Sequence, residues 1–156
     1  MRVTIERIMP GQDEKIALIR AYLVNHWCIS EEEAERHLAP HNTLGLPQSW
    51  VAVLPTRVLV GHVMLALERN GLCGVKDQPW LQALFVQESL RMQGIGRILV
   101  RVVEETGRRY GYRFVYLDTI REMHFYRNLG WEEIGTDVWA RGAEKDTVTV
   151  MRKRLD

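Results

Sequence analysis

At 156 residues the chain is long enough to bury one hydrophobic core, and it is predicted to form a single domain over residues 1–156. Apolar residues make up 46% of it and charged residues 26%, a balance that is typical of globular domains and excludes a disordered chain. The 21 Lys and Arg against 20 Asp and Glu leave a net charge of +1, so neither nucleic acid nor a membrane surface is an expected partner.

The sequence contains neither a targeting segment nor a cysteine motif. No apolar run has the length of a signal peptide or of a membrane span, so a cytoplasmic location is expected. Cys28 and Cys73 stand far apart, without the spacing of a zinc site. Two reduced thiols and no metal are therefore expected.

The first third of the chain predicts one strand and two helices. Residues 3–8 alternate like a strand, which Pro10 and Gly11 end. Residues 13–27 carry apolar side chains at helical spacing. Ser30 and Glu33 form a capping box, which predicts a second short helix that ends before Pro40.

The middle of the chain predicts strands. A loop over residues 41–49 precedes two strands, residues 50–54 and 57–67, which we expect to pair as an antiparallel hairpin. The polar residues 68–78 predict a surface connection. Residues 79–86 form a further strand, which leads into a turn rich in glycine.

The last third predicts one long helix over residues 94–110, with Gly111 as its stop. A strand over residues 113–117 should run parallel to the strand ending at Val86, through a right-handed crossover. A short helix over residues 122–129 and two paired strands, residues 131–140 and 147–152, complete the chain. This order predicts an α/β fold with a mixed sheet and one clear βαβ unit at the glycine turn.

The segment from Arg91 to Gly96 is the most informative part of the sequence. A strand, a glycine turn and a helix start in that order make an anion site, because the first N–H groups of a helix have no internal partner and carry the positive end of its dipole. Glycine lets the backbone approach a phosphate closely, and the Arg91 guanidinium adds a permanent charge. These residues therefore predict the binding of a phosphorylated ligand.

Two motifs make the chain resemble the GCN5-related N-acetyltransferases, the GNAT superfamily. The first is Arg91, two residues, Gly94, one residue and Gly96; the second is Phe125-Tyr126, three residues, Gly130 and Trp131. The resemblance extends to the element order of nearly the whole chain. It implies a single-domain, mixed and mostly antiparallel central sheet with helices on both faces, the acyl-CoA N-acyltransferase fold.

The resemblance also implies acetyl-CoA as co-substrate and acetyl transfer to an amine. In that case the backbone of the strand before the turn would bind pantetheine as if the cofactor were an added strand. The turn would hold the pyrophosphate, and Tyr126 would lie near the thioester sulfur. The implied donor-binding residues are Leu84, Phe85, Val86, Arg91, Met92, Gln93, Gly94, Ile95, Gly96, Arg97 and Tyr126.

The implied mechanism is direct attack by a neutral amine in a ternary complex. Tyr126 would protonate the leaving thiolate, and an N–H near Val86 would stabilise the oxyanion. Many relatives have a glutamate where this chain has Gln82, which cannot act as a base but can hold a water. The candidates for the general base are Glu122, Asp118, His124 and His62, and the sequence does not choose among them.

The acceptor is expected to be a small-molecule or peptide amine. Its choice would depend on the first two helices and on the loops around residues 28–48 and 69–79. The sequence does not determine the oligomeric state, and a homodimer is one of the alternatives. Gln82 and the short link before Tyr126 keep a second hypothesis open, a non-catalytic acyl-CoA-binding regulatory module, and transfer of a longer acyl group is a third.

Overall fold

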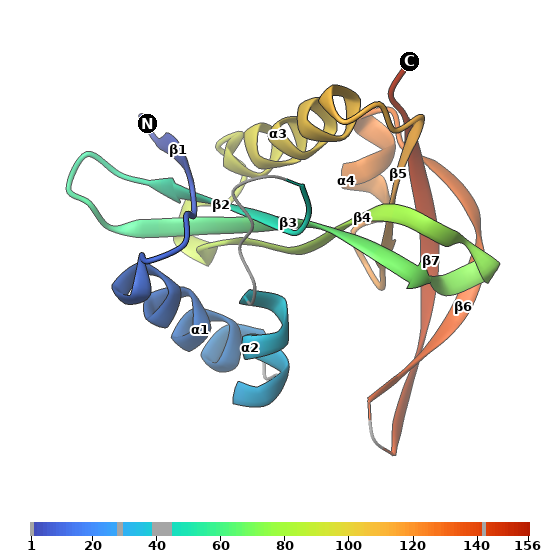
Figure 1. Ribbon diagram of the computed structural model, residues 1–156, viewed down its shortest axis with the longest axis horizontal. Coiled ribbons are helices and arrows are strands. Elements are labelled where there is room, and N and C mark those ends of the chain that lie inside the picture. Colours follow the sequence, from blue (N-terminus) through green and yellow to red (C-terminus); the bar gives the residue numbers. More distant parts are fainter. Residues whose placement is uncertain (1, 28–29, 39–44, 142) are drawn as a thin grey trace. The chain divides into compact units, whose positions relative to one another are not determined.

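The computed structural model describes residues 2–27, 30–38, 45–141 and 143–156 (Figure 1). Its α-helices are α1 Asp13–Trp27, α2 Glu31–Leu38, α3 Ile95–Arg109 and α4 Met123–Asn128. Its strands are β1 Thr4–Arg7, β2 Gln48–Val53, β3 Leu59–Asn70, β4 Lys76–Val86, β5 Phe114–Thr119, β6 Glu132–Arg141 and β7 Glu144–Arg154. Two short 3-10 helices, η1 Leu72–Gly74 and η2 Glu88–Leu90, flank β4. The helices and strands follow one another as predicted.

The strands form one seven-stranded sheet in the order β1-β2-β3-β4-β5-β7-β6. Strands β1 and β2, β2 and β3, β5 and β7, and β6 and β7 pair antiparallel. Strands β4 and β5 pair in parallel, with Trp80 opposite Tyr116, on either side of the predicted crossover through α3. The prediction of a mixed, mostly antiparallel α/β sheet is confirmed.

The chain divides into two compact units. The first comprises residues 1–66 and 82–103, and the second comprises residues 67–81 and 104–156. The boundaries fall inside β3, β4 and α3, so these three elements contribute to both units.

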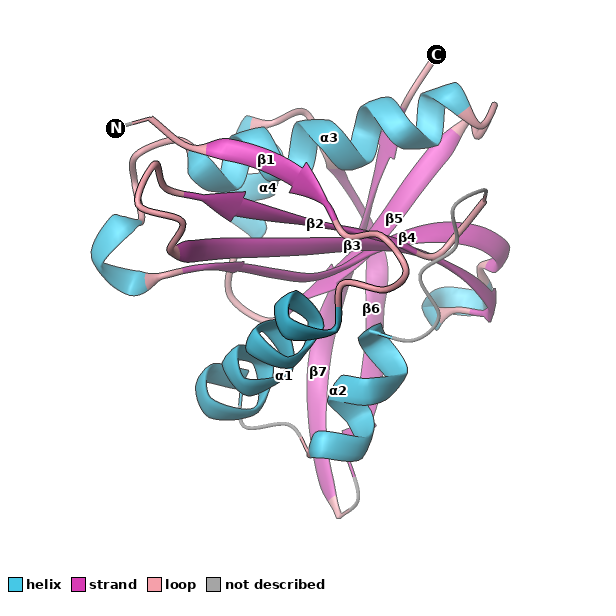
Figure 2. Cartoon of the chain, turned by 60° about the vertical axis from the view of Figure 1, so that its left-hand side comes forward, coloured by secondary structure: helices cyan, strands magenta, loops and turns pink. Residues whose placement is uncertain are grey.

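In the first unit, helices pack on both faces of the sheet (Figure 2). Val51 and Val53 of β2 face α1 and lie in one buried cluster with Ile19 and Leu23. Ala52 faces the other way, since neighbouring residues of a strand point to opposite faces. Its partner on β3 is Gly61, where an added Cβ would lie 3.1 Å from Leu99 of α3. The two α-helices therefore cover opposite faces, as predicted.

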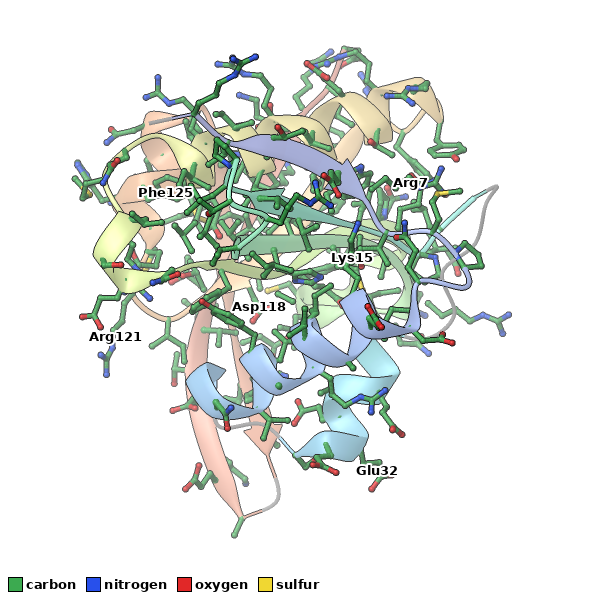
Figure 3. All side chains as sticks on the ribbon, turned by 90° about the vertical axis from the view of Figure 1, so that its left-hand side faces the viewer. Arg7, Lys15, Glu32, Asp118, Arg121 and Phe125 are labelled. Atoms are coloured by element: carbon green, nitrogen blue, oxygen red, sulfur yellow. The ribbon has the colours of Figure 1, made fainter. Side chains whose placement is uncertain are left out.

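Local signals set the helix starts of this unit. The Glu33 N–H donates to Ser30 Oγ at 3.1 Å, which confirms the predicted cap of α2. At the start of α1, Lys15 extends toward β1 (Figure 3), where its Nζ lies 2.9 Å from Glu6 Oε2. The other carboxylate oxygen of Glu6 accepts from Arg57 at 2.6 Å, so one acidic side chain ties β1 to α1 and to the turn between β2 and β3.

In the second unit, a small core contains Trp80 of β4, Tyr116 of β5 and Val150 of β7. Helix α3 ends in this unit at Arg109, and Gly111 is its stop, as predicted. Gly111 has φ +81°, and the Tyr112 N–H donates to Gly107 O at 3.0 Å. This pattern is the Schellman stop, which needs a residue that tolerates the left-handed region.

The prediction of a surface connection over residues 68–78 is wrong. Strand β3 continues to Asn70, η1 makes the turn, and β4 begins at Lys76. The Gly71 N–H donates to Val75 O at 2.8 Å, which closes the hairpin. An added Cβ on Gly71 would lie 2.6 Å from the Trp80 ring, so glycine admits this indole. Backbone pairing and one buried aromatic side chain thus outweigh the polar composition.

Candidate functional site

The glycine turn lies between β4 and α3, in the first unit. After η2, Met92 and Gly94 both adopt left-handed backbone conformations, with φ +63° and +86°. The side chains from Arg91 to Gly94 are exposed, and a Cβ added to Gly94 would have no atom within 4 Å. The turn is therefore an open one, with free space over its glycine.

Helix α3 begins directly behind this turn. The Ile98 N–H donates to Gly94 O at 3.1 Å, so the N–H groups of Ile95, Gly96 and Arg97 precede the first helical hydrogen bond. The buried side chain of Ile95 anchors the helix in the core, while Arg97 is exposed. A rigid helix end with unpaired donors and a positive dipole suits an anion.

Arg91 links the turn to the strand before it. Its Nε donates to Val86 O at 3.0 Å, although the side chain is exposed. The guanidinium thus holds the two ends of the connection together, and its remaining N–H groups keep a positive charge beside the turn. Gln93 is exposed in the same turn.

The backbone of β4 presents polar groups on the side away from β3. The Gln87 N–H donates to Val60 O of β3 at 2.8 Å, so the carbonyl of the same peptide plane, Val86 O, points away from β3. A Cβ on Gly61 of β3 would lie 3.1 Å from Phe85 O, which places that carbonyl on the β3 side and the Val86 N–H on the other. At Val86 this edge offers the N–H as a donor, while the carbonyl oxygen already accepts from Arg91 Nε.

Side chains from α1 support this part of β4. The Phe85 ring is buried and meets the Tyr22 ring edge-on, with centroids 4.9 Å apart. The Tyr22 hydroxyl donates to Gln87 Oε1 at 3.2 Å. Leu84, on the alternate position, is half-buried. The strand end is therefore held by packing and a hydrogen bond from the helix.

Gln82 and His62 also belong to the first unit. Gln82 lies half-buried on β4, one residue before Ala83, which has φ +54° in the middle of the strand. His62 of β3 is buried, and its Nδ1 lies 2.9 Å from Ala83 O. The histidine that the sequence offered as a base thus contacts the backbone of β4.

Tyr126 lies in the second unit, on α4. Its side chain is buried, with ring centroids 5.0 Å from Phe125 and 5.9 Å from Trp131. Burial and the negative charges of Glu122 and Asp118 raise the pKa of Tyr126 far above its usual range. The phenol therefore keeps its proton at neutral pH and can act as a proton donor.

Contacts at both ends hold the short helix α4. At its start, the Glu122 N–H donates to Thr119 Oγ1 at 3.0 Å. At its end, the Trp131 N–H donates to Tyr126 O at 3.1 Å, and Lys153 Nζ donates to Leu129 O. These contacts compensate for a helix too short to be stable alone.

Carboxylates flank Tyr126 in the sequence and in the second unit. Glu122 precedes it by one helical turn and is exposed at the N-cap of α4. Asp118 is the last residue but one of β5, where surrounding protein atoms and the negative charge of Glu68 raise its pKa. His124 is exposed, with its Nε2 3.2 Å from Asn128 Nδ2. The structure thus groups Glu122 and Asp118 with Tyr126, and it places Gln82 and His62 in the other unit.

Three features of the site carry no clear signal in the sequence. They are the left-handed Ala83 inside β4, the hydrogen bond of 3.0 Å from Trp131 Nε1 to Glu104, and the cap that Lys153 places on α4. Each joins residues distant in sequence or breaks a local preference. Local pattern therefore offered no way to find them.

Some predicted acceptor-binding segments fall outside the described residues, namely residues 28–29 and 39–44 of the loop around residues 28–48. Of the two cysteines, Cys28 lies in the same undescribed part, and Cys73 is an exposed free thiol. Among the residues that the structure describes, no helix combines the length and apolar character needed to cross a membrane. Within those ranges, no group of three or more His, Cys, Asp or Glu side chains is placed to hold a metal ion.

The sheet order and the open helix start behind β4 define a mixed α/β protein with one βαβ crossover at the end of its central strand. A sequence model of the Acetyltransferase (GNAT) family matches residues 15–131. The chain belongs to this family.

Similar proteins agree with this assignment. The chain is 37% identical to an acetyltransferase of Agrobacterium fabrum over 71 residues, which are 43% of this chain and 52% of that protein. It therefore spans about half the length of this curated relative.

Two solved structures share the fold. The NAA60 protein of Arabidopsis thaliana, in complex with acetyl-CoA, superposes with a TM-score of 0.77 at 15% identity, over 99% of each chain. An aminoglycoside 6'-N-acetyltransferase complexed with coenzyme A gives a TM-score of 0.75 at 19% identity, over 98% of this chain and 97% of the other.

Proposed function

We propose that the chain is an acetyl-CoA-dependent N-acetyltransferase, formed by one domain over residues 1–156, which acetylates a primary amine of a small molecule or peptide. The observation that carries the proposal is the open turn at Gly94, backed by the unpaired N–H groups at the start of α3. Family membership supports it, as do the acetyl-CoA and coenzyme A ligands of the two structures that share the fold.

The residues of the first unit fit the donor. The pyrophosphate would accept hydrogen bonds from the backbone between Met92 and Arg97, with free space over Gly94. The outward edge of β4, at Leu84 and Val86, would bind the pantetheine amides as an added strand. The Val86 N–H would then be available to a carbonyl oxygen that gains negative charge.

The amine would attack the thioester carbonyl, the C–N bond would form, and the C–S bond would break to release the thiolate. In this proposal Tyr126 donates the proton that the thiolate takes up, because burial keeps the phenol protonated. The carboxylates of Glu122 and Asp118 are the groups that accept the proton leaving the amine. Gln82 is assigned the binding of a water, since its side chain does not titrate.

Ligand binding tests the donor assignment. Saturating acetyl-CoA should raise the melting temperature, because a ligand that binds only the folded state stabilises it. The binding should release or absorb heat in calorimetry, and a Gly94→Ala variant should bind more weakly. The absence of both the thermal shift and the binding heat would contradict the proposal.

A panel of amines tests transfer. Small amines, aminoglycosides, lysine peptides and peptides with free N-termini should be incubated with acetyl-CoA, and release of coenzyme A followed together with the mass of the product. Glu122→Gln and Asp118→Asn should lower kcat, and the loss should shrink as pH rises and more acceptor is already neutral. Unchanged rates in both variants would remove the carboxylates from the mechanism.

Gln82 favours a second candidate, a regulatory module that binds acyl-CoA without transfer. A chain of that kind would bind acetyl-CoA but give no acetylated product with any amine of the panel, and Tyr126→Phe would change nothing measurable. Competition between acetyl-CoA and longer thioesters would show whether a longer acyl group is preferred.

A further inference from the structure

Strand β4 contains a residue in an unfavourable backbone conformation immediately before the predicted donor edge. Ala83 has φ +54°, in the left-handed region that residues with a Cβ rarely adopt inside a strand. Its side chain is buried in the cluster that holds Ile19 and Leu23 of α1. Such a conformation persists only where neighbouring groups stabilise it.

His62 provides this stabilisation. The ring is only 2% exposed, and its Nδ1 lies 2.9 Å from Ala83 O. A carbonyl oxygen can only accept, so Nδ1 carries the hydrogen and donates it. Two strand positions earlier on β3, the backbone carbonyl of Val60 accepts the Gln87 N–H. At Ala83 the imidazole thus supplies the donor that backbone pairing supplies at a regular strand position.

The direction of this bond determines the direction of the next donor. In a trans peptide the C=O of one residue and the N–H of the next point in opposite directions. Because Ala83 O is directed at the imidazole of His62, the Leu84 N–H is directed away from that ring. Leu84 lies two residues before Val86 on β4, so the alternation of the strand assigns its N–H to the same edge as the Val86 N–H, the edge assigned above to the acyl donor.

We propose that His62 is a positioning residue for the acyl donor. The hydrogen bond from its Nδ1–H to Ala83 O stabilises the left-handed conformation of Ala83 and thereby orients the backbone of Leu84 and Val86 toward the pantetheine and thioester of the donor. This inference rests on the proposed function. It also removes His62 from the candidate bases, since its role is to hold the backbone and not to accept a proton from the amine.

Two substitutions separate these roles. Asn places an amide nitrogen the same number of bonds from Cβ as Nδ1, so His62→Asn keeps the donor and removes the imidazole base. His62→Leu fills a similar apolar space and removes the donor. His62→Asn should keep kcat and the Kd for acetyl-CoA within about twofold of the unchanged protein, whereas His62→Leu should raise that Kd roughly tenfold, about 1.4 kcal/mol.

Amide hydrogen exchange supplies a readout on the ligand-free protein. In His62→Leu the Leu84 and Val86 amides should exchange faster and shift in the NMR spectrum, while those of β1 and β2 stay unchanged. If His62→Asn loses kcat as deeply as His62→Leu while both bind acetyl-CoA normally, His62 is a base and the proposal is wrong. Normal acetyl-CoA binding by His62→Leu would also overturn it.

The tautomer of the unsubstituted protein tests the proposal without any variant. Long-range proton–nitrogen NMR should show the hydrogen of His62 on Nδ1, with and without acetyl-CoA. A ring that carries it on Nε2 alone would overturn the proposal even if His62→Leu failed to fold. If the unsubstituted protein binds no acetyl-CoA, the proposed function fails, while the tautomer still reports whether His62 holds Ala83.

Discussion

The indole Nε1 of Trp131 donates a hydrogen bond of 3.0 Å to Glu104, which joins the residue after α4 to the C-terminal half of α3. The Trp131 backbone N–H donates to Tyr126 O, and the two rings pack edge-on. A single tryptophan therefore connects the proton donor assigned above to the long helix.

Removing this indole donor should destabilise the protein and weaken activity. Trp131→Phe keeps an aromatic ring and removes the N–H, which should cost about 1 kcal/mol of unfolding free energy and more if Glu104 is left without a partner. The loss can be measured by denaturant unfolding. Glu104→Gln keeps an acceptor oxygen and serves as the control; an equal loss in both variants would show that charge, and not the hydrogen bond, is responsible.

Tyr126→Phe should lower kcat by roughly 10²-fold with little change in the KM for acetyl-CoA. The melting temperature should stay near that of the unchanged protein, because phenylalanine keeps the ring that packs against Phe125 and Trp131. Steady-state kinetics and thermal melts check both parts. A large fall in stability with unchanged kcat would make the tyrosine a purely structural residue.

Gly94→Ala should raise the Kd for acetyl-CoA roughly tenfold, since its Cβ would enter the space over the turn. Strain is a separate effect, because a Cβ at φ +86° should cost about 1–2 kcal/mol of stability. Gly11 has the same φ of +86° and equally open surroundings, so Gly11→Ala is a matched control. Both variants should lose similar stability, and only Gly94→Ala should lose affinity. Equal affinities would contradict the pyrophosphate assignment.

Stability should depend on pH through Glu6. Hydrogen bonds from Arg57 and Lys15 lower its pKa from 4.5 to about 2. A carboxyl group with a lowered pKa stabilises the fold fully above its unfolded pKa, so this contribution is present above pH 4.5 and lost as pH falls toward 2. Glu6→Gln should therefore be less stable at pH 7, by up to about 1 kcal/mol for such a partly exposed pair.

Denaturant unfolding at several pH values checks this prediction. The difference between Glu6→Gln and the unchanged protein should shrink below pH 4.5 and nearly vanish near pH 2. Added salt at pH 7 should also reduce it, because salt screens exposed ion pairs. A difference that is independent of pH would assign the effect to packing of the side chain.

The sequence determined the features that depend on neighbouring residues. Helical periodicity, the Ser30 cap, the Gly111 stop and the alternation of the strands are local, and they were enough to predict the order of the elements. The turn from Arg91 to Gly96 was identifiable for the same reason, since its strand, glycines and helix start are contiguous. Composition was misleading in the hairpin of β3 and β4, where pairing and one buried tryptophan decide the structure, and β2 begins at Gln48, inside the loop predicted over residues 41–49.

Only the tertiary structure decided which side chains support the site. The bond from His62 to Ala83 spans 21 residues, and that from Trp131 to Glu104 spans 27 residues. The left-handed backbone of Ala83 opposes its local preference and exists because a histidine on the next strand and a packed core hold it. Local sequence therefore predicts where the glycine turn lies, and long-range packing determines the backbone conformation of the strand beside it.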